Sequence, residues 1–272
     1  MAELTNVGSA KVKAARRLRK RAFREQDGAF LAEGAQAVRE ALAAQPSPVR
    51  ELFVTADARA RHADLVRRAT SSGLPVHQAS GRVLEELSET VTPQGLVAVC
   101  DPVDVLLEAA LSSTPRPPRL AVLLAAIRDP GNAGTVLRTA DAAGADLVAF
   151  SDTSVDPYNG KCVRASAGSL FHLPVVLGAD LAAAAAAFRG AGMQVLAADG
   201  AATEDLDQLD GNGELAKPTA WIFGNEAWGL PADVIALADR SVRVPIHGRA
   251  ESLNLAAAAA VCLYASARAQ RG

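Results

Sequence analysis

The clearest pattern along the chain is a series of short apolar runs in its second half. The first run, 120–127 (LAVLLAAI), is apolar throughout, as expected for a strand buried on both faces of a parallel sheet. Similar runs predict five more strands, at 146–151, 174–178, 194–198, 220–224 and 242–246. Helices are expected between most of them and at the end, at 133–143, 157–169, 180–191, 231–238 and 253–269. The second half is therefore predicted to be a doubly wound α/β domain with a mostly parallel sheet.

The first half alternates shorter helical and strand patterns. Strands are expected at 50–55, 74–78 and 95–99, and helices at 10–24, 58–72 and 81–89. This alternation predicts a smaller α/β domain. The run SSTPRPP at 112–118 favours turns and extended backbone, so it cannot lie within a helix or a central strand. We therefore predict domains at 1–102 and 119–272, joined by a linker at 103–118.

Composition and charge limit the possible functions. The 272 residues carry a net charge of −2, so RNA affinity would have to come from local patches. The three cysteines, Cys100, Cys162 and Cys262, are dispersed and form no CxxC, which argues against a disulfide framework and a metal site and predicts buried thiols. The N-terminus lacks an apolar signal region and no run is long enough to span a membrane, so we expect a cytoplasmic protein.

Several familiar motifs are absent from the sequence. An α/β domain of this kind usually binds a nucleotide-like ligand beyond the carboxyl ends of its strands. Yet the sequence has no GxGxxG after the first strand, no Walker-type loop, no GxSxG and no HExxH. An ordinary dehydrogenase, NTPase, hydrolase or zinc protease is therefore disfavoured.

The first of three polar, glycine-containing segments is RDPGNAGTVLRTA at 128–140. Its Pro-Gly pair ends the strand at 120–127, and Asn132 is expected to cap the following helix. Arg138 is expected about a turn and a half into that helix. Taken alone, an N-cap and a surface arginine explain both residues.

The other two segments also follow predicted strands. FGNEAWGLP at 223–231 places Glu226 between two glycines, and its open backbone suits close approach to an adenine or ribose edge. VPIHGRAESLNLA at 244–256 leads into the last helix, with Ser252 expected as N-cap and Asn254 in the first turn. Glu226 alone could be an ordinary solvated loop acid.

In this order and at these strand ends, the three segments resemble the signature motifs of the SpoU/TrmH branch of the SPOUT methyltransferases. The resemblance covers about 119–272 and includes the segment VRASAGSLF at 163–171. It implies transfer of a methyl group from S-adenosylmethionine to a ribose 2′-hydroxyl of RNA. It also implies a deep trefoil knot, which spacing could not have shown, and a homodimer formed through the methyltransferase domain.

The resemblance also assigns roles to matching residues. Arg138 is expected to polarise the 2′-hydroxyl, because an arginine is nearly always protonated and is a poor free base. Residues expected to orient Arg138 and the ribose are Asn132, Glu226, Ser252 and Asn254. Contacts with S-adenosylmethionine, many of them through the backbone, are expected from Phe223, Gly224, Asn225, Gly229, Leu230, Ile246, Ser252 and Leu253. No metal is expected.

The N-terminal segment is predicted to bind RNA. A cluster of basic residues without an intervening acid comprises Lys11, Lys13, Arg16, Arg17, Arg19, Lys20, Arg21 and Arg24. Such a cluster can neutralise several phosphates, although a solvated helix face is the ordinary explanation. The segments FLAEG at 30–34 and TPQGLVAV at 92–99 resemble the substrate-binding domain of many relatives, which is similar to a small ribosomal protein. Arg164 is expected to grip phosphate near the active site.

The sequence is compatible with three functions. The first is ribose 2′-O-methylation of ribosomal RNA, with 23S as the favoured rRNA, antibiotic self-protection as a variant and transfer RNA as a less favoured substrate. The second is an inactive RNA-binding relative, which the five intact polar positions disfavour. The third is an unrelated α/β enzyme that binds NAD or ATP.

Overall fold

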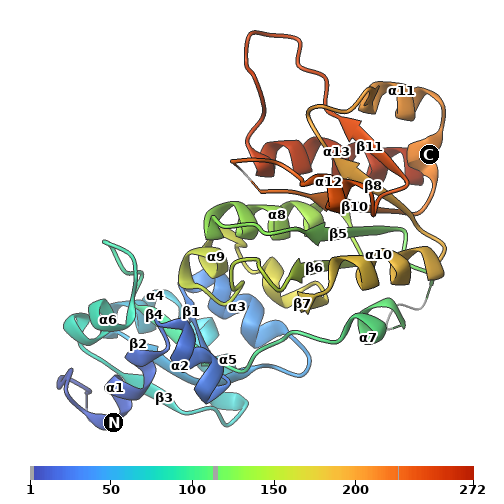
Figure 1. Ribbon diagram of the computed structural model, residues 1–272. Helices are drawn as coiled ribbons and strands as arrows, with labels where there is room; N and C mark the ends of the chain where they lie inside the picture. Colours follow the sequence, from blue (N-terminus) through green and yellow to red (C-terminus); the bar gives the residue numbers. More distant parts are fainter. Residues whose placement is uncertain (1–2, 113–115, 226) are drawn as a thin grey trace. The chain divides into compact units, whose positions relative to one another are not determined.

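The computed structural model describes residues 3–112, 116–225 and 227–272, and the chain divides into two compact units (Figure 1). The first unit comprises Met1–Val103 and Asp156–His172. The second comprises Asp104–Val155 and Leu173–Gly272. A segment from the second half of the sequence therefore folds with the first unit.

The first unit contains a four-stranded mixed sheet in the order β1-β4-β2-β3. Its strands are β1 (Phe30–Glu33), β2 (Val49–Val54), β3 (Val76–Gln78) and β4 (Leu96–Cys100). Strand β4 is antiparallel to β1 and β2, whereas β3 is parallel to β2. Every residue of β1 and β4 is buried, so both faces of these strands are covered.

Helices surround this sheet. They are α1 (Ala10–Arg17), α2 (Arg21–Asp27), α3 (Ala35–Ala43), α4 (Ala56–Arg61), α5 (Ala63–Ser71), α6 (Gly81–Leu87), α9 (Gly160–Ala165) and the short 3₁₀ helix η1 (Ser169–Phe171). Val12 and Leu18 from the N-terminal segment pack with Leu87 of α6 and Val97 of β4 in one core. The segment 156–172 adds aromatic contacts, because the rings of Tyr158 and Phe171 lie 4.5 and 6.1 Å from that of Phe30.

The second unit contains a seven-stranded sheet in the order β7-β6-β5-β10-β8-β11-β9, and all of its strand pairs are parallel. Its strands are β5 (Leu120–Leu124), β6 (Leu147–Ser151), β7 (Val175–Ala179), β8 (Gln194–Ala198), β9 (Glu204–Asp205), β10 (Thr219–Phe223) and β11 (Arg240–Arg243). The predicted parallel sheet is confirmed.

Helices cover both faces of the parallel sheet. They are α7 (Leu107–Ser112), α8 (Pro130–Ala143), α10 (Leu181–Gly190), α11 (Leu206–Gly211), η2 (Glu214–Ala216), α12 (Ala232–Ile235) and α13 (Leu255–Arg271). Residues of α7, α10 and α12 pack against Ala220 and Ile222 of β10. Trp221, which lies between these two residues, points to the other face of the sheet, where its indole N–H donates to the side chain of Ser266 of α13 at 2.9 Å. The sheet is thus the middle layer.

Several predicted elements are divided or extended in the structure. The helix expected at 10–24 is interrupted between α1 and α2, and the one at 58–72 is split into α4 and α5. Strand β1 and helices α3, α7 and α11 were not among the predicted elements. The expected linker 103–118 includes α7, whose Ala110 is buried in the core, while 113–115 lie outside the described residues. The compact units also differ from the predicted domains in the place of Asp156–His172.

Two further expectations concern the cysteines and the membrane. All three cysteines are buried thiols, as predicted. None of the helices in the described parts of the chain combines the length and apolar character that a membrane crossing requires. The trefoil knot stays a prediction, because strand order and pairing do not specify how the chain is threaded.

Candidate active site

The first predicted site segment forms the turn between β5 and α8. Asp129 is the N-cap of α8, and its carboxylate accepts a hydrogen bond from the Asn132 N–H at 2.8 Å. Pro130 takes the first helical position, where a missing N–H costs nothing. The prediction that Asn132 caps this helix is therefore wrong: Asn132 lies in the first turn, and its side chain is available for a different contact.

Arg138 lies further along α8, as predicted. Its side chain is exposed, and it makes no hydrogen bond or ion pair with any other residue that the structure describes. A guanidinium group remains charged at any physiological pH. Among the described residues, no acid pairs with the charge of Arg138, which lies on the helix that carries Asn132.

The third predicted segment is the long loop that joins β11 to α13 (Figure 1). Its last residue, Asn254, is the N-cap of α13, and its side-chain oxygen accepts from the N–H groups of Ala256 and Ala257 at 2.9 and 3.4 Å. The prediction that Ser252 caps this helix is wrong, because the helix begins at Leu255, three residues later. Ser252 is exposed on the loop.

The first and third segments meet through Asn132 and Asn254. The side-chain amide of Asn254 donates to the side-chain oxygen of Asn132 at 3.1 Å, across 122 residues of sequence. Because Asn254 also caps α13, its orientation is held by two backbone N–H groups. Two segments that are far apart in the sequence therefore meet in the structure.

The second predicted segment forms a closed turn after β10. Asn225 and Gly229 exchange two backbone hydrogen bonds of 2.9 Å. Gly229 adopts a positive φ of 69°, and a Cβ on Gly224 would approach the Gly229 carbonyl oxygen to 2.5 Å, so glycine is required at both positions. The Asn225 side chain accepts from Ala227 N–H and donates to the Ala126 carbonyl, both at 2.8 Å. All polar groups of Asn225 are thus used to fix the turn.

The predicted cofactor residues divide into buried and exposed groups. Phe223 and Leu230 are buried. Ile246 and Leu253 are each 39 % exposed. Trp228, which follows β10 in the second motif segment, is 65 % exposed. Large contiguous patches of exposed apolar side chains mark ligand or partner sites, whereas single exposed ones are normal. Glu226 lies outside the described residues.

The basic N-terminal residues are mostly paired within the first unit. Pairs with carboxylates are made by Lys11 (Glu51), Arg16 (Glu86), Arg17 (Asp27), Arg19 (Glu89), Arg21 (Glu25) and Arg24 (Asp156). Lys13 and Lys20 have no acidic partner among the described residues. The local sequence gave no sign of this, because four of the six acids lie between 40 and 132 residues away.

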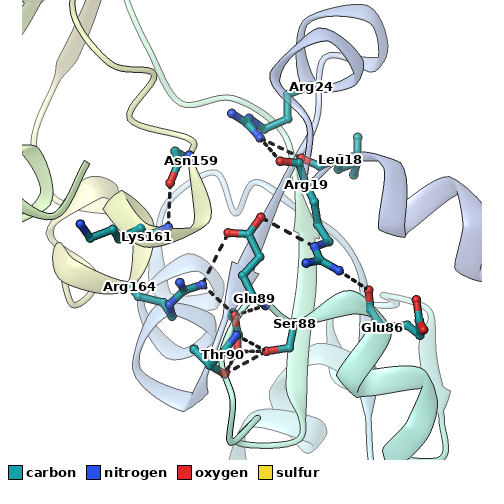
Figure 2. A network of polar contacts seen from close by, with 11 residues as sticks. Leu18, Arg19, Arg24, Glu86, Ser88, Glu89, Thr90, Asn159, Lys161 and Arg164 are labelled. Atoms are coloured by element: carbon teal, nitrogen blue, oxygen red, sulfur yellow. Dashed lines mark hydrogen bonds and ion pairs between the residues drawn. The ribbon is translucent and has the colours of Figure 1, made fainter. Parts of the chain in front are cut away.

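Arg164 belongs to the same polar network, which Figure 2 shows around Glu89. Its guanidinium donates to the carboxylate of Glu33 at 2.9 Å and lies 3.9 Å from that of Glu89. Glu33 also accepts from the side chains of Ser88 and Thr90. Arg164 was expected to grip RNA phosphate, but here its charge is balanced by acids of the first unit.

No group of histidine, cysteine or carboxylate side chains suited to a metal occurs among the described residues. The polar groups shown to converge are the side-chain amides of Asn132 and Asn254, which act by hydrogen bonding. This set suits binding and orientation of a substrate hydroxyl.

Comparison with known proteins connects this geometry to a family. Residues 119–264 match the SpoU rRNA Methylase family, and residues 9–98 match the MRM3-like substrate binding domain. The 23S rRNA (guanosine(2553)-2′-O)-methyltransferase RlmP of Bacillus subtilis is 34 % identical, over 97 % of this chain and 98 % of its own.

Solved structures agree with this match. The rRNA methyltransferase from Sinorhizobium meliloti superposes with a TM-score of 0.82 at 29 % identity, covering 98 % of this chain and 97 % of that one. The SpoU methyltransferase AviRb from Streptomyces viridochromogenes, in complex with the cofactor AdoMet, gives 0.79 at 30 %, covering 97 % and 98 %. The chain thus has the SPOUT methyltransferase fold, and it belongs to the SpoU rRNA methylase family. This membership excludes an unrelated NAD- or ATP-binding enzyme.

Proposed function

We propose that this protein methylates a ribose 2′-hydroxyl of ribosomal RNA, with S-adenosylmethionine as the methyl donor. The observation that carries the proposal is the hydrogen bond between Asn132 and Asn254, since it brings two of the three motif segments to one place. RlmP, which is named as a 23S rRNA 2′-O-methyltransferase, matches nearly the whole chain and supports 23S rRNA as the substrate.

The residues around this point fit S-adenosylmethionine. Ile246 and Leu253 offer exposed apolar surface to an adenine ring, and the closed turn at Gly224–Gly229 offers rigid backbone. When bound, this cofactor supplies a methyl group on a sulfonium, which is an already activated electrophile. Ser252 and Glu226 are proposed to assist in the same site, as their motif positions imply.

The chain's own contribution is to orient the acceptor oxygen and assist the loss of its proton. The Arg138 guanidinium would hydrogen-bond to the 2′-oxygen and favour its anionic form, because a fixed positive charge stabilises developing negative charge. Arg138 stays protonated, so the proton itself passes to water or to an RNA phosphate. Asn132 and Asn254 would hold the ribose in line with the transferred methyl group.

We also propose that the first unit binds the RNA and that the active form is a homodimer. Within the described part of the chain, Lys13 and Lys20 are the residues of the basic cluster that have no acidic partner. On α13, Val261 and Tyr264 are 42 % and 53 % exposed, which supports a second copy of the chain as the partner of this helix. Light scattering at micromolar concentration tests the dimer, and a monomer mass would contradict it.

The test of the reaction uses purified protein, radiolabelled S-adenosylmethionine and 23S rRNA, with transfer RNA as a second substrate. We expect Arg138→Ala to lower kcat at least a hundredfold while the Kd for S-adenosylmethionine, from isothermal titration, changes less than threefold. Arg268→Ala removes another exposed arginine of the same unit, which pairs with Asp210, and should leave kcat unchanged.

Three results would contradict the proposal. Absence of cofactor binding by the wild-type protein would favour an inactive RNA-binding relative. Methylation of transfer RNA alone would move the substrate to another RNA class. Equal activity of Arg138→Ala and wild type would remove Arg138 from the reaction. Mapping 2′-O-methyl positions in rRNA from cells with and without the gene would identify the nucleotide and bear on any role in antibiotic resistance.

A further inference from the structure

The turn that leads from β5 to the catalytic helix α8 has an unusual backbone. Ala126, two residues after the end of β5, adopts a positive φ of 56°. This left-handed conformation is rare for a residue with a Cβ and persists only where surrounding contacts enforce it. Contacts with the surrounding structure must therefore hold Ala126 and the next residue, Ile127, in this conformation.

Two buried serines provide these contacts: Ser151, the last residue of β6, and Ser154, three residues later. The Ser151 hydroxyl accepts from Ala126 N–H at 3.0 Å, and the Ser154 hydroxyl accepts from Ile127 N–H at 3.2 Å. Ser154 in turn donates to the Leu124 carbonyl at 2.9 Å. The two serines are 3 % and 6 % exposed, so water does not compete with these bonds.

The remaining backbone groups of the turn are also engaged. The Ile127 carbonyl accepts from Val155 N–H at 2.8 Å, and the Ala126 carbonyl accepts from the Asn225 side chain at 2.8 Å. Ile127 itself is fully buried. The turn is thus fixed from two sides, by the segment 151–155 and by the turn after β10.

The position of this turn determines where the catalytic helix begins. Asp129, the N-cap of α8, is two residues after Ile127, and α8 carries Asn132 and Arg138. A shift of Ile127 would therefore move the start of α8 relative to Asn254, which is held by its own cap on α13. A displacement of about 1 Å at an active site can lower a rate by about a hundredfold.

We infer that Ser151 and Ser154 are positioning residues for methyl transfer. They lie outside the three motif segments and act through the backbone of Ala126 and Ile127, which sets the register of α8. This inference rests on the proposed function, since it assigns a role within that reaction.

The test compares Ser154→Ala with Ser266→Ala. Ser266 is a matched control, because it is a fully buried serine of the same unit whose hydroxyl accepts from Trp221. We expect Ser154→Ala to lower kcat ten- to a hundredfold, with KM for rRNA and Kd for S-adenosylmethionine within threefold of wild type. Ser266→Ala should lose thermal stability to a similar degree and keep kcat within twofold.

A second readout does not depend on activity. Hydrogen exchange of the peptide covering 125–132 should be at least tenfold faster in Ser154→Ala, because Ile127 N–H has lost its acceptor, and unchanged in Ser266→Ala. A wild-type protein that methylates rRNA, combined with unchanged kcat in Ser154→Ala, overturns the inference. Unchanged exchange overturns it even if the wild type proves inactive, an outcome that would separately refute the proposed function.

Discussion

The buried ion pair between Arg24 and Asp156 allows a sharp prediction about stability. Two guanidinium nitrogens of Arg24 donate to one carboxylate oxygen of Asp156, at 2.8 and 2.6 Å. The two side chains are only 6 % and 12 % exposed. Arg24 also donates to the carbonyls of Leu18 and Arg19 (Figure 2). It therefore cannot reach water without losing four hydrogen bonds.

The perturbation is Asp156→Asn, which keeps the shape and one acceptor oxygen but removes the negative charge. Breaking a buried pair by removing one partner costs about 3–5 kcal/mol. Because Asn retains an acceptor and the site is slightly exposed, we expect the lower end, about 3 kcal/mol. At roughly 2–4 °C per kcal/mol for a chain of this size, the Tm should fall by about 6–12 °C.

The assay is thermal unfolding followed by circular dichroism and by calorimetry. Asp64→Asn is the control, because Asp64 forms an ion pair with Arg39 at a similar distance of 2.9 Å but at an exposed site. Its Tm should stay within error of wild type. In the double variant Arg24→Met/Asp156→Asn, part of the loss should be recovered, since no charge is left buried. Equal Tm values for Asp156→Asn and Asp64→Asn would refute the reasoning.

Two further predictions concern RNA binding and the thiols. Charge reversal of Lys13 and Lys20 together should weaken the salt dependence of rRNA binding. Each lost phosphate contact lowers the slope of log binding constant against log salt concentration by about 0.9, so the two together should lower it by about 1.8. An unchanged slope would show that neither lysine contacts the RNA. Burial raises the pKa of the Cys262 thiol to about 12 and also raises that of Cys100. A thiol reagent at pH 8 should therefore modify these cysteines at least a hundredfold more slowly in the native protein than in denaturant, and rapid native labelling would contradict their burial.

Local pattern was sufficient for most of the elements in the second half. The run 120–127 has no polar residue that would favour a solvated face, so burial on both faces followed directly, and its successors are mostly apolar. The cap residues were harder to predict. Asp129 and Asn132 are both good N-caps, as are Ser252 and Asn254, and the choice depends on where the preceding loop ends.

The basic cluster shows the opposite case. No acid lies between Lys11 and Arg24, and this predicted an open RNA-binding surface. The tertiary structure brings Glu51, Glu86 and Glu89 next to it, each from a distant part of the chain. Charge patterns along a sequence report only near neighbours, whereas ion pairing depends on distance in space.

The sequence by itself determined the fold class and the family, because strand burial and glycine-dependent turns are visible in the pattern of a few neighbouring residues. Only the tertiary structure decided that Asn132 meets Asn254, that 156–172 folds with the first unit, and that Ser151 and Ser154 fix the turn before α8. Each of these depends on contacts between residues far apart in the chain. Such contacts form through packing of the whole sheet and its helices, and no local pattern encodes them.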